Sequence, residues 1–273
     1  MTLVMAWRSE DGLTVCADTR IADGDARVTD VGPKLFQVPV EVTPFGLNDE
    51  PVQHLTVGFA FSGNTLMAQS CCAIASTCLA SLSAVSAEAL VAPESIVHFF
   101  AKAAEYVSEE RRFLTPASPP RFEAMIFGWD QVQLAPFIYH VEVADVDNKL
   151  VATVERKPLS VGGIAYFGSG AKFLGETLKK LDQKPPHKTI SPHQLMEAAI
   201  ASAQVKSVGG SLQFATASKS GVRLRSFMRV SRTGEADISI LGCSIRKLWN
   251  PEGPIPGAGG IAVAIKDDID YPS

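Results

Sequence analysis

The chain has 273 residues, of which 46% are hydrophobic and 20% are charged, so it can bury one large core. Its formal net charge of -4, without any long run of Lys or Arg, argues against a nucleic-acid or anionic-membrane partner. The five cysteines lack CxxC and metal-ligand spacing, which is typical of reduced thiols in the cytoplasm. We therefore predict a cytoplasmic globular protein that uses no metal and no cofactor.

Two segments bear on membrane association. The opening residues, MTLVMAWRSEDG, lack the basic start and the long apolar core of a secretory signal. Residues 65–87 carry no charge, but they consist mainly of Ala, Ser, Thr, Cys and Gln, which insert poorly into a bilayer. We expect a helix covered by protein here, and no transmembrane span.

The first half of the chain alternates short β-prone runs with turn signals. The pair Asp11-Gly12 predicts a hairpin that joins two opening strands. The stretch 39–53 contains three prolines and indicates an insert. Strands are predicted at 3–7, 13–17, 26–31, 35–38 and 54–61, and helices at 65–84 and 94–113.

The second half contains a predicted meander, two helices and three closing strands. Ser191-Pro192 is a typical helix start. The tail that begins at Cys243 contains GPIPGAGG and DDIDYPS and has no periodicity, so we predict an extension or arm over 243–273. The predicted strands are 122–128, 137–143, 149–156, 160–167, 211–216, 222–230 and 236–241, and the predicted helices are 172–181 and 192–208.

The order of the elements predicts the fold class. Strands and helices occur in separate runs, which is typical of an α+β protein with antiparallel sheets. We expect one domain over residues 1–242, with the insert at about 39–53. Its predicted architecture is a four-layer αββα sandwich, in which two antiparallel sheets lie between helix layers.

Three residues near the N-terminus form a candidate nucleophilic site. Removal of Met1 gives Thr2 both a hydroxyl group and a free α-amine that can act as its base. Asp18 and Lys34 lie at the predicted ends of neighbouring strands, and a lysine paired with an aspartate beside a hydroxyl eases its deprotonation. Each residue alone is more often a turn residue or a solvated residue. The presence of Thr2, Asp18 and Lys34 together is what indicates a nucleophilic site.

These residues resemble the active site of a known family. The opening TLVMAWRSEDGLTVCADTRIADG and VGPKLFQV resemble proteasome β-subunits and HslV-like threonine peptidases, which are N-terminal-nucleophile (Ntn) hydrolases. Thr2, the motif Asp18-Thr19-Arg20 and Lys34 match the family's nucleophile, D-T-R motif and lysine. The resemblance continues through Gly63, Phe127-Gly-Trp-Asp130 and Gly168-Ser169-Gly170, and it suggests a bacterial proteasome-homologue branch.

The resemblance implies a role for each matched residue. Thr2 is the nucleophile, Lys34 lowers the pKa of its hydroxyl, and Asp18 keeps Lys34 charged. Gly63 donates its N–H to the oxyanion, and Ser169 orients the α-amine. The family also implies a homo-oligomeric double ring of heptamers or hexamers, a peptide substrate, and an ATPase or cap as a possible regulator.

One departure from the family pattern keeps other functions open. The turn at residues 203–210 lacks the family's carboxylate and has Val205 at about that place. One alternative is therefore a non-catalytic ring or scaffold subunit of the same fold. The other is an Ntn amidase that acts on a small amide.

Overall fold

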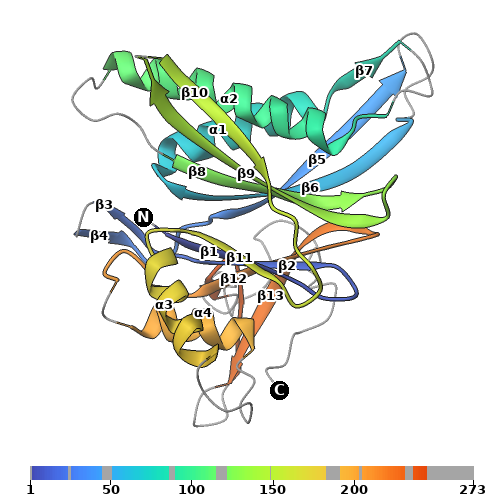
Figure 1. Ribbon diagram of the computed structural model, residues 1–273. Helices are drawn as coiled ribbons and strands as arrows, with labels where there is room; N and C mark the ends of the chain where they lie inside the picture. Colours follow the sequence, from blue (N-terminus) through green and yellow to red (C-terminus); the bar gives the residue numbers. More distant parts are fainter. Residues whose placement is uncertain are drawn as a thin grey trace, which may run out of the picture.

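The computed structural model describes residues 2–23, 26–44, 51–85, 90–114, 122–147, 149–182, 191–202, 205–230 and 236–244. Its two large sheets lie face to face (Figure 1). The seven-stranded sheet has the order β11-β1-β2-β12-β13-β14-β15, and every neighbouring pair is antiparallel. In that order its strands are Ile164–Gly168, Leu3–Arg8, Leu13–Asp18, Leu212–Ser218, Gly221–Val230, Ala236–Ile240 and Cys243–Ser244.

The six-stranded sheet has the order β10-β9-β8-β6-β5-β7. Its strands are Lys149–Arg156, Ala135–Val146, Phe122–Asp130, Gln53–Gly63, Leu35–Pro44 and Leu82–Ala84. The short strand β7 pairs parallel with β5, whereas the other pairs are antiparallel. A separate two-stranded ribbon consists of β3 (Ile21–Asp23) and β4 (Ala26–Thr29).

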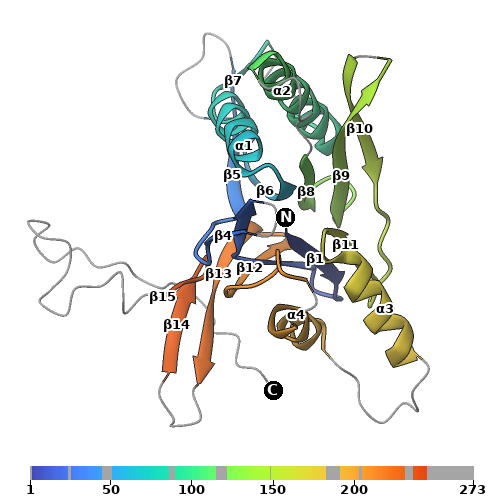
Figure 2. The same ribbon diagram turned by 90° about the vertical axis from the view of Figure 1, so that its left-hand side faces the viewer.

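The helices form two pairs on opposite sides of the molecule. Helices α1 (Thr65–Leu79) and α2 (Pro93–Leu114) lie on the six-stranded sheet, whereas α3 (Ala171–Asp182) and α4 (Pro192–Ala201) lie against the seven-stranded sheet (Figures 1 and 2). The side chain of Asn64 caps α1 by accepting a hydrogen bond from the Met67 N–H. A capping box at Ser191 begins α4, as the Ser191-Pro192 pair predicted.

Alternation along β1 shows why this strand is central to the core. Leu3 and Met5 pack toward α3 and α4, and Val4 and Ala6 pack toward the six-stranded sheet. All four side chains are fully buried. The start of β1, and with it Thr2, is therefore held by packing on both faces.

The predicted fold class is wrong. Instead of a four-layer αββα sandwich, the described part of the chain is mostly β, with 49% of it in strands and 27% in helices, and the six-stranded sheet is a curled half-barrel. Long strands explain the difference: β5, β6 and β9 have 10, 11 and 12 residues, and twist accumulates along such strands and curls the sheet.

Several predicted boundaries also change. The start of the expected insert at 39–53 forms the second half of β5, which pairs with β6 from Pro39 opposite Thr56 to Val42 opposite Gln53; residues 45–50 lie outside the described part. The first predicted helix ends at Leu79, and β7 follows it. The last predicted helix ends at Ala201. Of the C-terminal extension, Cys243 and Ser244 form β15, and residues 245–273 are not described.

The cysteines are free, as the sequence predicted, although they differ in exposure. Burial raises the pKa of Cys71 and Cys72 to about 12, so both remain protonated, unreactive thiols at neutral pH. Cys78 is exposed. No helix in the described ranges combines the length and the apolar character needed to cross a membrane.

Candidate active site

Asp18 and Lys34 form a buried ion pair at the end of β2. Lys34 Nζ lies 3.0 Å from Asp18 Oδ1, and the side chains are 1% and 0% exposed. The same oxygen accepts the Leu3 N–H at 2.9 Å, which places the pair directly beneath the start of β1. The structure thus brings Asp18 and Lys34 together next to Thr2, as the sequence predicted.

Backbone donors complete the coordination of Asp18. Its second oxygen, Oδ2, accepts the N–H of Gly209 at 3.0 Å and that of Arg20 at 3.2 Å. Burial lowers the pKa of Lys34 below its usual value, and the charge of Asp18 raises it again only in part. The Asp18 carboxylate thus favours the charged form of Lys34 against the effect of burial.

Gln213 on β12 fixes the backbone around this pair, and the sequence reasoning missed it. Its Oε1 accepts the N–H groups of Lys34 and Leu35 at 3.0 and 3.2 Å. Its Nε2 donates to the carbonyl oxygens of Asp18 and Gly32 at 3.1 and 3.0 Å. The one buried amide thus ties β2 to the segment that carries Lys34. In the sequence, the role of Gln213 was indicated only by its position as a polar residue between Leu212 and Phe214 in a predicted strand.

Ser169 holds the main chain of Thr2. Thr2 N–H donates to Ser169 Oγ at 3.1 Å, and Ser169 Oγ lies 3.3 Å from the Thr2 carbonyl oxygen. The predicted contact between Ser169 and the nitrogen of residue 2 is therefore present. In the chain as it stands this nitrogen is a backbone amide, which is not a base. It becomes a basic amine only when Met1, which lies outside the described residues, is removed.

Ser207 provides a polar partner for Ser169. Its Oγ lies 2.9 Å from Ser169 Oγ, and its side chain is 4% exposed. Val205 instead packs against the apolar cluster beneath the seven-stranded sheet. Because α4 ends at Ala201, Ser207 lies in the turn before β12, close to Ser169. The sequence predicts a turn over residues 203–210 but gives no indication that Ser207 in this turn contacts Ser169.

The Asp18-Thr19-Arg20 motif joins this turn to the rest of the site. Arg20 donates to Asp30 Oδ1 at 2.7 Å and to the carbonyl oxygens of Lys206 and Val208. Hydrogen bonding to Arg20 lowers the pKa of Asp30. A Cβ atom at residue 209 would lie 2.3 Å from the Arg20 guanidinium carbon, so any other residue there would displace the Arg20 guanidinium.

Gly63 lies at the end of β6, next to the N-terminus of α1, with φ at +101°. Its neighbour Ser62 lies close to Thr2, because a Cβ atom at Gly168 would contact both Ser62 Oγ and the Thr2 carbonyl oxygen. A glycine N–H beside a helix N-terminus can stabilise an oxyanion. The role of Gly63 as that donor stays a prediction.

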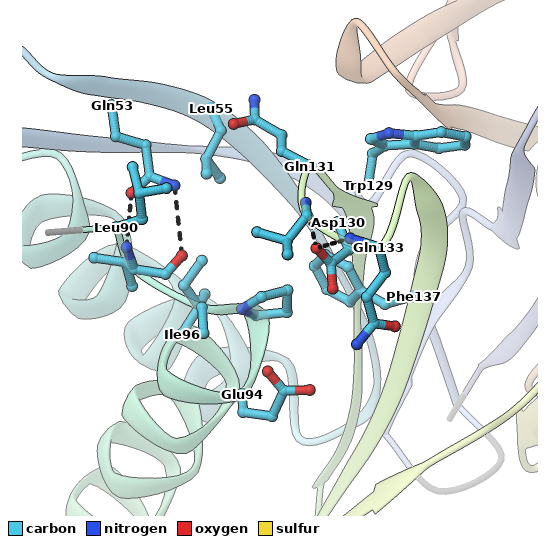
Figure 3. Close-up of a pocket in the computed structure, with 14 residues that line it drawn as sticks. Gln53, Leu55, Leu90, Glu94, Ile96, Trp129, Asp130, Gln131, Gln133 and Phe137 are labelled. Atoms are coloured by element: carbon cyan, nitrogen blue, oxygen red, sulfur yellow. Dashed lines mark hydrogen bonds between the residues drawn. The ribbon is translucent and has the colours of Figure 1, made fainter. Parts of the chain in front are cut away.

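A separate apolar hollow of about 240 Å³ lies far from Thr2 along β6 (Figure 3). Its lining includes Gln53 and Leu55, at the end of β6 opposite Gly63, together with Glu94 on α2 and Phe137 on β9. Gln53 closes one side by hydrogen bonding to the backbone of Val91. Thr2 itself is buried, with 1% exposed. The hollow is therefore not an extension of the candidate site.

Comparison with models of protein families and with curated proteins finds no match to this sequence. The likeness to proteasome β-subunits therefore depends on the residues and spacings of the chain itself. The described residues contain no group of three or more His, Cys, Asp or Glu side chains that could hold a metal ion.

Replacing Asp18 tests the energetic role of the pair. We expect Asp18→Ala to lower the free energy of unfolding by about 3–5 kcal/mol, because it leaves Lys34 buried without a counterion. The control is Arg27→Ala, which removes an exposed pair with Asp30 and should cost about 1 kcal/mol or less. Urea denaturation measures both variants, and equal losses would contradict the expectation.

Proposed function

We propose that the chain is an N-terminal threonine endopeptidase that becomes active when Met1 is removed and Thr2 is exposed as the nucleophile. The observation that carries the proposal is the buried Asp18–Lys34 pair beneath the start of β1. Buried ion pairs stabilise proteins poorly, so a structural role alone accounts weakly for this one. Ionisable groups with shifted pKa values in such surroundings are typical of catalytic sites.

The proposed reaction uses the free amine of Thr2 as the base. The amine takes the proton from Thr2 Oγ, which attacks the substrate carbonyl while the charge of Lys34 stabilises the developing alkoxide. Gly63 N–H binds the oxyanion. The proton then passes to the leaving amine, the C–N bond breaks, and an ester to Thr2 remains. Water hydrolyses this ester and restores the hydroxyl group.

Ser169 and Ser207 give the proposed amine a fixed direction. Ser169 Oγ accepts a hydrogen bond from the Thr2 nitrogen and donates its own hydrogen to the Thr2 carbonyl oxygen, while Ser207 Oγ, 2.9 Å away, can donate to Ser169 Oγ. In this proposal Ser207 takes over the orienting role of the missing carboxylate. It adds no negative charge, so the charges of the site are those of Asp18, Lys34 and the amine.

A self-assembled ring in the bacterial cytoplasm, fed by an ATPase or a cap, belongs to the same proposal. The supporting observation is the outer face of α1, a helix without any charged residue. Leu66 and Ile74 on that face are 62% and 38% exposed. The solvent face of a helix usually carries charges, so a second subunit is the proposed cover for this face.

A scaffold subunit with an inactive site is the second candidate. It is favoured by the burial of Thr2, which is 1% exposed, and by the absence of the family's carboxylate at Val205. The two candidates differ in whether Met1 is removed and whether Thr2 reacts.

Intact-mass spectrometry and a threonine-directed epoxyketone test the catalytic proposal. We expect the purified protein to lack Met1 and to gain the mass of one inhibitor at Thr2. Thr2→Ala is the matched control, which should lose Met1 and gain no adduct. Retention of Met1 on essentially all chains, or processed protein without an adduct, would favour the scaffold.

Replacing Lys34 tests the proposed charge effect. We expect Lys34→Ala to lower peptide turnover by about 10³-fold, because the alkoxide loses its neighbouring cation. Assembly should be unchanged in gel filtration. Lys149→Ala, at the exposed start of β10, is the control and should leave turnover unchanged. Wild-type activity in the Lys34 variant would rule out the proposed role.

Replacing Ile74 tests the proposed interface. A lysine at this position places a charge in the uncharged face of α1, so Ile74→Lys should convert the assembled protein to smaller species in light scattering. Val161→Lys is the control, because Val161 is 55% exposed and lies away from α1. A wild-type protein that is itself a monomer would contradict the ring and would favour the small-amide hydrolase.

A further inference from the structure

A second hollow lies at the far end of β1 from Thr2 and has a cationic lining. Its volume is about 330 Å³, and Arg8, Arg156 and Lys157 all contribute to its wall. None of the residues that line it is acidic. Three cations from two separate segments thus face one space.

Arg8 is incompletely paired within the described residues. Its Nη1 donates to the Leu159 carbonyl oxygen at 2.7 Å, but its Nε is buried and has no hydrogen-bond partner. No described carboxylate forms an ion pair with it. A buried donor without a partner on a charged group is unfavourable, because it has lost its hydration and gained no hydrogen bond in return. The Arg8 guanidinium therefore has an unused donor that can bind an anionic ligand.

The charges of Arg156 and Lys157 are only weakly neutralised by nearby carboxylates. Lys157 Nζ lies 2.5 Å from Glu155 Oε1, and Arg156 Nη1 lies 3.9 Å from Glu94 Oε1. All four of these side chains are more than one-third exposed, so solvent screens both pairs. The two exposed carboxylates, Glu94 and Glu155, do not neutralise the three cations, so the hollow has a net positive charge.

The rest of the wall is apolar and narrows the class of ligand. Leu13, Phe137, Ile138 and Leu159 lie beside the cations. An inorganic anion such as phosphate leaves these side chains without a contact. A peptide segment that carries carboxylates next to apolar side chains can pair with the cations and also pack against the apolar residues of the lining.

We propose that this hollow binds residues 267–271 of the chain's own C-terminal segment. In that stretch Asp267, Asp268 and Asp270 flank Ile269 and Tyr271, which is the alternation of charge and apolar surface that the hollow fits. The segment belongs to the residues that the structure does not describe, and its sequence carries the assignment. The proposal is independent of the chemistry at Thr2.

The length of chain after β15 allows this binding. The residues between Ser244 and Asp267 can span up to about 70 Å when extended. Strands β2 and β15 are four positions apart in the sheet, a separation of about 20 Å at about 4.8 Å per strand. Tethering also raises the local concentration of the segment to about the millimolar range.

Zero-length cross-linking of the full chain tests the proposal. A carbodiimide joins a lysine amine to a carboxylate as an amide, with loss of water. We expect mass spectrometry to find Lys157 joined to Asp267, Asp268 or Asp270. The Lys157–Glu155 link serves as an internal standard, because that pair is already in contact. The variant with Asp267, Asp268 and Asp270 all replaced by Asn should lose the long-range links and keep the standard.

Variants of the hollow provide the matched comparison. Arg8→Gln should lower the yield of the long-range links several-fold, and Arg156→Gln does the same if the first variant folds poorly. Lys219→Gln, at a different cationic surface, should leave the yield unchanged. Lys157 linked to Glu155 alone would overturn the proposal. Links found only between isotopically distinct copies would also overturn it, since they would assign the hollow to a neighbouring chain.

Discussion

The ion pair of Asp18 and Lys34 is the constraint on which the site depends. A charge pair with exposures of 0% and 1% is stable only if its remaining hydrogen-bonding capacity is filled. Asp18 meets this demand with three backbone N–H groups besides Lys34, from Leu3, Arg20 and Gly209. The pair thereby fixes the start of β1, the end of β2 and the turn before β12 relative to one another.

The second consequence concerns the hydroxyl groups near Thr2. Ser169 and Ser207 offer donors and acceptors without a charge. The proposed amine therefore hydrogen-bonds to a neutral oxygen, and the charges of the site come from Lys34 and Asp18. Val205 packs against the apolar cluster beneath the seven-stranded sheet and takes no part in these hydrogen bonds.

Local signals in the sequence predicted most elements and part of the site. Asp11-Gly12 marked the first hairpin and Ser191-Pro192 the start of α4, because these residues act on their immediate neighbours. Gln213 and Ser207 were missed because their partners lie 179 and 38 positions away. The curl of the six-stranded sheet and the parallel strand β7 were missed for the same reason. Both result from strand pairing and twist across the whole sheet, which no local pattern records.

The hydrogen bonds of Gln213 connect the site to the order in which the chain is made. Gln213 and Asp18 are 195 positions apart, so the contact between β2 and β12 closes a very long loop. A nascent chain that has not yet produced β12 holds Thr2, Asp18 and Lys34 without the amide that ties two of them together. Contacts of such high sequence separation form late and slowly. The hydrogen bonds from Gln213 to the backbone of Asp18 and Lys34 therefore form only after β12 has been synthesised and has paired with β2.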